Sequence, residues 1–153
     1  MTNIIKTGLT AFIALAGAYL GGCGHFQPQS LGNDQYGQAI RYVEDPLEAR
    51  CSATYEKNEP VIRCNPEWLG KLPYDFQQFA VNHELGHLVY DHPHENDIPV
   101  IEAETQADDY AIRKLKSEDI DIGEIIKEFT LRYRYSGERI ENLTKLKKQL
   151  KKE

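Results

Sequence analysis

The segment HELGH at residues 83–87 constrains the possible structure more than any other part of the sequence. Apolar residues recur at three-and-four spacing through residues 74–91, and this pattern predicts an amphipathic helix. On such a helix His83 and His87 project from one face, so both imidazoles can reach one metal ion. Glu84 then lies beside the ion, where it can act as a general base on water.

Other residues of this segment predict how the helix begins, packs and ends. Asp75 is expected to be its N-terminal cap. Gly86 costs about 1 kcal/mol relative to alanine inside a helix, which indicates that something needs to approach the backbone there. His92 and His94 flank a proline that ends the helix, and we interpret them as loop histidines rather than as further ligands.

A catalytic metal site of this type needs a third protein ligand and an open fourth position. A second helix is predicted at residues 100–116, and it carries Glu104 and Asp108 one turn apart on one face. We expect Glu104 to bind the metal and Asp108 to support the site, for example by accepting the ring N–H of a ligand histidine. Glu102 and Asp109 are the alternatives to these two carboxylates.

The remainder of the C-terminal half is predicted to be helical, at residues 122–135 and 138–152. The junction between these helices contains Tyr133, Tyr135 and Arg139, which are candidates for stabilising an oxyanion near the metal. The basic end of the last helix is most simply a solvated helix face. Contact with anionic lipid, or closure over the site as a latch, are alternative functions for it.

Residues 39–70 have the composition of strands and turns, so the predicted fold class is α+β, mostly helical, with a small hairpin or sheet before the HELGH helix. Two short strands are expected to turn at residues 57–59. Cys51 and Cys64 would then lie opposite each other, within reach of a disulfide bond.

The N-terminus has the features of an export signal. Residues 8–20 form an apolar run that is too short to span a bilayer comfortably, and the sequence LGGC ending at Cys23 resembles a bacterial lipobox. That resemblance implies cleavage before Cys23 and attachment of lipid to its thiol. We therefore predict a lipoprotein signal peptide at residues 1–22, a tether at 23–38 and one folded domain at 39–153.

Export and charge together limit the possible partners. The formal net charge of −6 argues against nucleic acid as a partner. An oxidising compartment favours a disulfide between Cys51 and Cys64. Because residue 24 is glycine and not aspartate, the lipobox resemblance implies the outer membrane, if the host has one. The expected location is extracytoplasmic, in the cell envelope, with the membrane contacted through lipid on Cys23.

The segments HELGHLVYDH and ETQAD resemble the gluzincin metallopeptidases, especially those related to CAAX-type prenyl-protein proteases and their minimal soluble relatives. The resemblance covers about residues 60–115. The roles that it implies are zinc ligation by His83, His87 and Glu104, catalysis by Glu84 and support by Asp108. It also implies that residues 60–65 form an edge strand that holds an extended peptide by strand addition. Two departures are the short interval between His87 and Glu104 and the lack of a clear histidine after Glu104.

These features predict a zinc-dependent metalloendopeptidase that hydrolyses an extracytoplasmic protein or peptide. Two other classes are considered. One is a catalytically weak or inactive envelope lipoprotein that binds peptides, like a chaperone, on the same scaffold. The other is a purely structural lipoprotein without metal.

Overall fold

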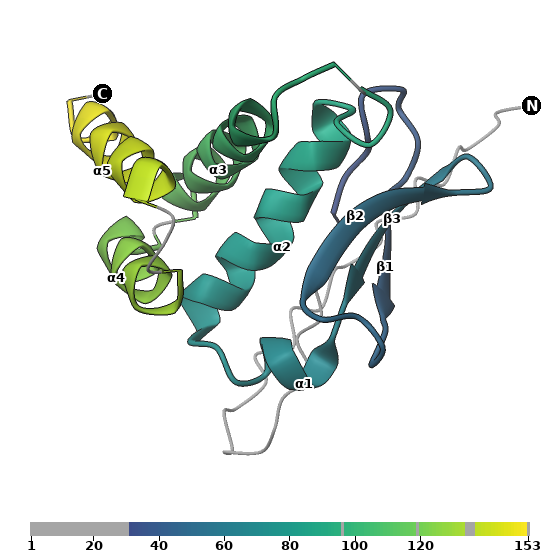
Figure 1. Ribbon diagram of the computed structural model, residues 1–153, viewed down its shortest axis with the longest axis horizontal. Coiled ribbons are helices and arrows are strands. Elements are labelled where there is room, and N and C mark those ends of the chain that lie inside the picture. Colours follow the sequence, from purple (N-terminus) through teal and green to yellow (C-terminus); the bar gives the residue numbers. More distant parts are fainter. Residues whose placement is uncertain (1–30, 96, 119, 134–136, 153) are drawn as a thin grey trace, which may run out of the picture.

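One central helix organises the fold. The computed structural model describes residues 31–95, 97–118, 120–133 and 137–152, and it has the predicted α+β class. Helix α2 (Tyr74–Val89) lies between a small sheet and the helices α3 and α4, while α5 packs on α3 and α4 (Figure 1). The other elements are β1 (Arg41–Glu44), β2 (Cys51–Glu56), β3 (Glu59–Cys64), α1 (Pro66–Leu69), α3 (Val100–Lys116), α4 (Ile122–Arg132) and α5 (Gly137–Leu150).

The sheet has the strand order β1-β3-β2, with β3 parallel to β1 and antiparallel to β2. Lys57 and Asn58 form a two-residue hairpin turn, and both have positive φ angles, of 52° and 66°. Turns with two left-handed residues match the twist of the flanking strands, and asparagine tolerates that conformation well. The hairpin predicted from the sequence is confirmed, although its turn is shorter than residues 57–59.

The expectation that residues 60–65 form an edge strand is wrong. Strand β3 lies in the middle of the sheet, so its backbone hydrogen-bonding groups face β1 on one side and β2 on the other. A strand paired on both sides has no free edge for an added peptide. Among the described strands, β2 is the edge strand that lies next to α2.

A disulfide bond joins Cys51 and Cys64, as predicted. The two residues are directly opposite each other in the antiparallel register of β2 and β3. This pairing explains why the hairpin brings the two thiols together without any further rearrangement of the backbone. The disulfide therefore links the edge strand β2 to the centre of the sheet.

Helix α2 differs from the amphipathic helix that was predicted, because it is covered on both sides. Its buried residues point in all directions around the helix axis. They are Phe76, Phe79, Ala80, Val81, Asn82, His83, Leu85, Gly86 and Leu88. Asp75 lies in the first turn and is not the N-cap, since Pro73 takes that position and accepts the backbone N–H groups of Phe76 and Gln77.

The C-terminal end of α2 is closed by a left-handed residue. The helix ends at Val89, earlier than the predicted residue 91, and Asp91 has a φ angle of 60°. The backbone N–H of His92 donates to the carbonyl of His87, and that of Asp91 donates to Leu88. These two bonds form a Schellman motif, the usual way in which a left-handed residue ends a helix.

Helices α2 and α3 approach each other closely at Gly86. A Cβ atom at residue 86 would lie 2.9 Å from the Cα of Ala107 and 3.1 Å from its carbonyl oxygen. The expectation that something approaches the backbone at Gly86 is confirmed, and the structure identifies the neighbour as helix α3. This contact brings the histidine-bearing turns of α2 beside the first half of α3.

The remaining helices differ from prediction mainly at their ends. Helix α3 has the predicted bounds, whereas α4 ends at Arg132 rather than residue 135, and α5 spans 137–150 rather than 138–152. Helix α1 was not predicted; Asn65 caps it by accepting the backbone N–H of Trp68. In the part of the chain that the structure describes, no helix is long and apolar enough to cross a bilayer.

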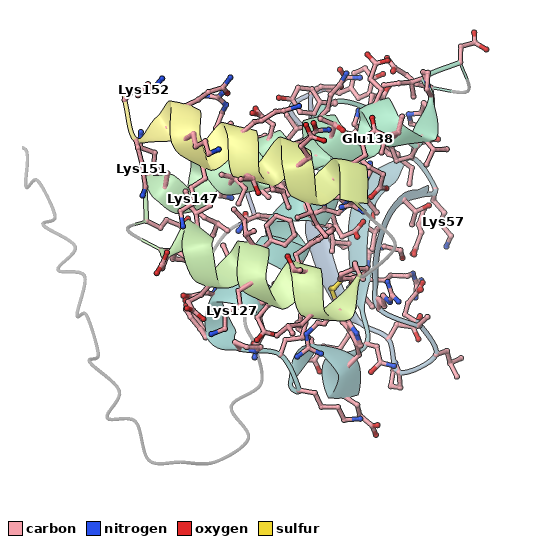
Figure 2. The ribbon with its side chains drawn as sticks, turned by 60° about the vertical axis from the view of Figure 1, so that its left-hand side comes forward. Lys57, Lys127, Glu138, Lys147, Lys151 and Lys152 are labelled. Carbon is pink, nitrogen blue, oxygen red and sulfur yellow. A yellow bond between two sulfur atoms is a disulfide. The ribbon has the colours of Figure 1, made fainter. Side chains whose placement is uncertain are left out.

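The two terminal segments of the chain differ in how much of each the structure describes. The predicted signal peptide, Cys23 and residues 23–30 of the predicted tether lie outside the described residues. The rest of the predicted tether contacts the domain: Asp34 is buried and accepts the hydroxyl of Tyr55, while Tyr36 donates to Asp91. At the other terminus, Figure 2 shows α5 beside α4, with the lysines Lys147, Lys151 and Lys152 toward its C-terminal end and Glu138 at its start.

Candidate metal centre

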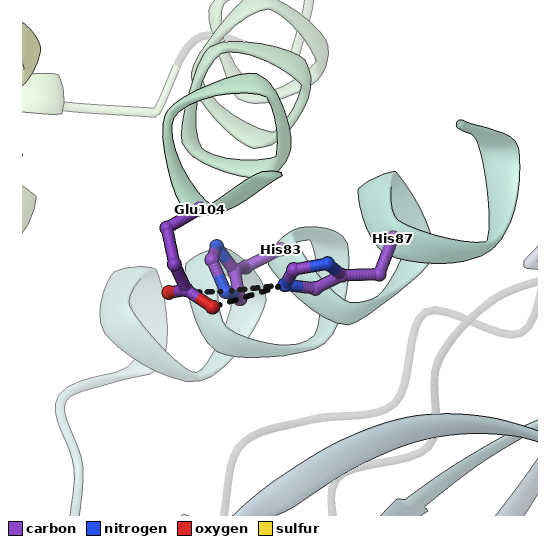
Figure 3. Close-up of side chains that lie close together, drawn as sticks. All are labelled: His83, His87 and Glu104. Carbon is purple, nitrogen blue, oxygen red and sulfur yellow. Dashed lines mark hydrogen bonds and ion pairs between the residues drawn. The ribbon is translucent and has the colours of Figure 1, made fainter. Parts of the chain in front are cut away.

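Three side chains from two helices converge on one point. The Nε2 atoms of His83 and His87 lie 3.1 Å apart. Each lies 3.5 Å from one carboxylate oxygen of Glu104, Oε2 for His83 and Oε1 for His87. Figure 3 shows the three side chains pointing toward one another, the histidines from α2 and the glutamate from α3.

These distances suit a metal ion. Ligand atoms held about 2.0–2.1 Å from a tetrahedral ion are separated by roughly 3.3 Å along each edge of the tetrahedron. The observed separations of 3.1 and 3.5 Å lie on either side of that value. The group formed by His83, His87 and Glu104 could therefore hold a metal ion without a large movement of the backbone.

The outer nitrogen of His83 supports the same conclusion. Nδ1 of His83 lies 2.9 Å from Oδ1 of Asp108, although this contact lacks the direction of a standard hydrogen bond. A carboxylate can only accept, so the proton of a neutral His83 belongs on Nδ1 and the lone pair on Nε2. The lone pair of His83 then faces His87 and the negative Glu104. Such a cluster of electron-rich atoms needs a cation, either a metal ion or a proton, between them.

Arg139 connects the two carboxylates of α3 from the first turns of α5. Its Nε and Nη2 donate to the two oxygens of Asp108, at 2.9 and 2.7 Å, and its Nη1 lies 2.5 Å from Oε2 of Glu104. The guanidinium also lies over the ring of Phe129, 4.9 Å from its centroid. Arg139 thus neutralises and orients both carboxylates, and each of its three guanidinium nitrogens makes one of these contacts.

The charges of the cluster shift the pKa values of its members. Burial alone would lower the pKa of His83, but its contacts with Asp108 and Glu104 outweigh burial and raise that pKa to about 10. Burial alone would raise the pKa of Glu104, but contacts with the two histidines, and the charge of Arg139, hold it well below its usual range. Glu104 is therefore a carboxylate at neutral pH.

Glu84 has the opposite shift. Burial raises the pKa of Glu84 above its ordinary value, although the neighbouring His83 and His87 partly oppose that effect. A carboxyl group with a raised pKa is better suited to accept and return a proton near neutral pH than an ordinary glutamate. Glu84 also lines the same cavity as the three candidate ligands.

The cluster opens into a cavity of about 530 Å³ between the sheet and the helices. One wall is the edge strand β2, with Cys51, Ser52 and Ala53. The aromatic residues of the cavity are Trp68, Phe76, Phe79, Phe129 and Tyr133. The cavity therefore combines an extended strand, an apolar surface and the candidate metal ligands.

The structure separates the predicted site residues into three groups. His83, His87, Glu104, Asp108 and Arg139 make the direct contacts given above, and Glu84 and Tyr133 line the cavity with them. Tyr135 lies outside the described residues. The alternative carboxylates lie away from the cluster: Glu102 is exposed, and Asp109 pairs with Arg113 at 2.8 Å.

The sequence did not reveal the roles of His92 and Gln106, which lie behind the cluster. Nδ1 of the buried His92 lies 2.8 Å from Nδ1 of His87, and Nε2 of His92 lies 3.1 Å from Oε1 of Gln106. The sequence indicates only that His92 directly follows the predicted end of the helix, where the chain changes direction. That signal does not reveal which way the ring points.

Comparison of the chain with models of known protein families, with curated proteins and with solved structures found no match.

Proposed function

We propose that the protein is a zinc-dependent metalloendopeptidase. The observation that carries this proposal is the convergence of two imidazole nitrogens and one carboxylate on a single point, with Glu84 beside them in an open cavity. Imidazole ligands favour zinc and other late first-row metals over calcium or magnesium. Two histidines and one acid leave a fourth position open, which is typical of catalytic rather than structural zinc sites.

Each residue of the cluster has a role in the proposed reaction. A zinc ion held by His83, His87 and Glu104 would polarise a peptide carbonyl and lower the pKa of a coordinated water to about 7. Glu84 accepts one proton of the attacking water and passes it to the amine as the carbon–nitrogen bond breaks. Asp108 and Arg139 hold His83 and Glu104 in place.

The edge strand β2 supplies the proposed binding surface for the peptide. An extended peptide can add to a free strand edge through backbone hydrogen bonds, which give affinity without strict sequence specificity. Cys51, Ser52 and Ala53 of β2 line the cavity that contains Glu84. In this proposal β2 takes the place that the sequence assigned to residues 60–65.

The proposed substrate is an extracytoplasmic protein or peptide. This part of the proposal rests on the sequence alone, through the signal-like residues 1–22 and lipid on Cys23. Anchoring at the membrane would place the domain close to proteins of the cell envelope.

The proposal is tested by metal content and by three substitutions. We expect about one zinc ion per chain in the wild-type protein, and loss of that ion in His83→Ala and Glu104→Ala. Glu84→Gln keeps the shape and polarity of the side chain but removes its basicity. It should retain zinc and lose peptide hydrolysis by at least about a hundredfold.

The outcomes separate the three classes of function. Wild-type rates in Glu84→Gln would exclude the proposed mechanism. A zinc-loaded wild-type protein that binds peptides from a library but cleaves none would identify the peptide-binding class. A protein purified without chelators that holds no metal, and takes up none on addition of zinc, would contradict the metal centre itself.

A further inference from the structure

The outer nitrogen of His87 has an unusual partner. Nδ1 of His87 lies 2.8 Å from Nδ1 of His92, so the two imidazoles meet nitrogen to nitrogen. The outer nitrogen of His83, by contrast, faces the carboxylate of Asp108. A carboxylate fixes the position of the proton because it only accepts, whereas a neutral imidazole can donate or accept. The direction of the bond between His87 and His92 therefore depends on what holds the other side of His92.

Gln106 determines that direction. Its Nε2 donates to the carboxylate of Glu102 at 3.4 Å, which leaves its Oε1 facing Nε2 of His92 at 3.1 Å. Because an amide oxygen only accepts, His92 carries its proton on Nε2 and has a lone pair on Nδ1. His87 must then donate its Nδ1 proton to His92. The remaining nitrogen of His87, Nε2, keeps the lone pair that faces His83 and Glu104.

The backbone holds His92 in the position that this arrangement needs. The Schellman motif at the end of α2 ties the backbone N–H of His92 to the carbonyl of His87 at 2.9 Å. The left-handed residue of that motif, Asp91, is itself held by the hydroxyl of Tyr36 and by Nδ1 of His94. His92 is therefore a buried residue fixed at both backbone and side chain, rather than a mobile loop histidine.

His92 is also poorly placed to be a metal ligand. Its Nδ1 faces the outer nitrogen of His87, on the far side of that ring from Glu104, and its Nε2 is engaged by Gln106. Among the described residues, the group of side chains that could hold a metal consists of His83, His87 and Glu104. The contacts of His92 thus support a role that acts through His87.

We propose that His92, oriented by Gln106, is the positioning residue that holds His87 in the Nδ1–H tautomer and directs its Nε2 lone pair at the metal. This inference deepens the proposed function and rests on its metal centre. The two histidine ligands would be fixed by different means, His83 by a carboxylate and His87 by a chain of neutral side chains. Residues that orient metal-binding histidines typically affect metal affinity by about 10–100-fold.

The first test measures zinc affinity by competition with a chelator, without any peptide. His92→Leu removes the acceptor and should weaken zinc binding by about 10–100-fold. His92→Gln restores an acceptor oxygen and should recover most of that loss. Tyr74→Leu is the control, because it is an aromatic-to-leucine change at an exposed residue in the first turn of α2, and it should bind zinc as the wild type does.

The second test observes the proton positions directly in the metal-free protein by ¹⁵N NMR of the imidazole rings. We expect His87 to be protonated on Nδ1 and His92 on Nε2. Protonation of His92 on Nδ1 would overturn the inference, because His92 would then donate to His87. Unchanged zinc affinity in a folded His92→Leu protein would overturn it as well. Neither measurement needs proteolysis, so failure to find a peptidase activity leaves this inference intact.

Discussion

At the scale of single residues, a proton would compete with the proposed metal ion for the same place. The carboxylates of Asp108 and Glu104 outweigh burial and raise the pKa of His83 to about 10. In the metal-free protein at neutral pH, this ring is therefore an imidazolium with a proton on both nitrogens. The positive charge then lies where the three side chains converge. Zinc binding requires a lone pair on the ligand nitrogen, and it must therefore displace this proton.

This competition makes zinc binding dependent on pH. Zinc binding at pH 7 should release about one proton, and zinc affinity should rise by about tenfold per pH unit up to the pKa of His83. The stability of the metal-free protein should change in the opposite sense. The protonated ring stabilises the fold fully below pH 6.5, the ordinary pKa, and that contribution is lost as the pH rises through about 10.

Isothermal titration calorimetry in buffers of different ionisation enthalpy measures the released proton, and denaturation of the metal-free protein at several pH values measures stability. The same titration on Asp108→Asn provides a comparison. Without the carboxylate the pKa of His83 should fall, so fewer protons should be released per zinc ion bound at pH 7. Zinc affinity that is independent of pH between 7 and 9 would contradict the competition.

Residue spacing predicted the candidate ligands, because the two histidines lie one helical turn apart, and so do the two carboxylates. Each pair therefore projects from one face of its helix. Spacing within α2 and α3 is local and can be read without knowing how the helices pack. The contacts of His92 and Gln106 could not be predicted in this way. They depend on the left-handed conformation of Asp91, and on the packing of the turn after α2 against α3.

At the scale of elements, Gly86 sets the distance between the two helices that hold the site. Gly86→Ala would place its Cβ 2.9 Å from the backbone of Ala107, closer than a stable contact allows. Helix α3 would have to move away from α2 and take Glu104 with it. We predict a loss of about 1–3 kcal/mol in the free energy of unfolding, as found for overpacked cores, together with weaker zinc binding.

Gly137→Ala is the matched control for this prediction. Gly137 also lies in a helix, but a Cβ atom there would meet no atom within 4 Å. The same substitution should therefore be neutral or slightly stabilising, since alanine favours helix formation. Urea denaturation and zinc competition on both variants make the measurement. Equal behaviour of the two variants would show that the approach of α2 and α3 does not position Glu104.

Two predictions about secondary-structure elements were wrong because they depend on how the elements pack. Apolar periodicity located α2 and α3, but it gave α2 a solvent-exposed face that it lacks, because the sheet and the helices cover it from both sides. Strand β1 pairs in parallel with β3 and makes it the central strand. A parallel pairing across a long connection leaves no local signal, which is why the sequence predicts an edge strand at residues 60–65.

At the scale of the whole molecule, the two sides of the cavity have different functions in the proposed enzyme. The helices α2 and α3 carry the candidate metal ligands, whereas the edge strand β2 forms the wall along which a peptide would bind. The disulfide between Cys51 and Cys64 crosslinks the sheet, because both cysteines lie in the hairpin, and it joins none of the helices covalently. Loss of the disulfide should therefore affect the two sides unequally.

Removal of the disulfide should therefore affect stability and peptide binding more than metal binding. The double variant Cys51→Ala and Cys64→Ala opens a loop with a sequence separation of 13 residues, and its unfolded chain gains entropy as a result. For a loop of about that length the expected loss of stability is about 3 kcal/mol. The thermal midpoint should fall, whereas zinc stoichiometry should stay at the wild-type value because no ligand lies in the sheet. If β2 holds the peptide, KM should rise more than kcat falls. Loss of zinc from a variant that is still folded would show instead that the sheet and the metal-binding helices are coupled through α2.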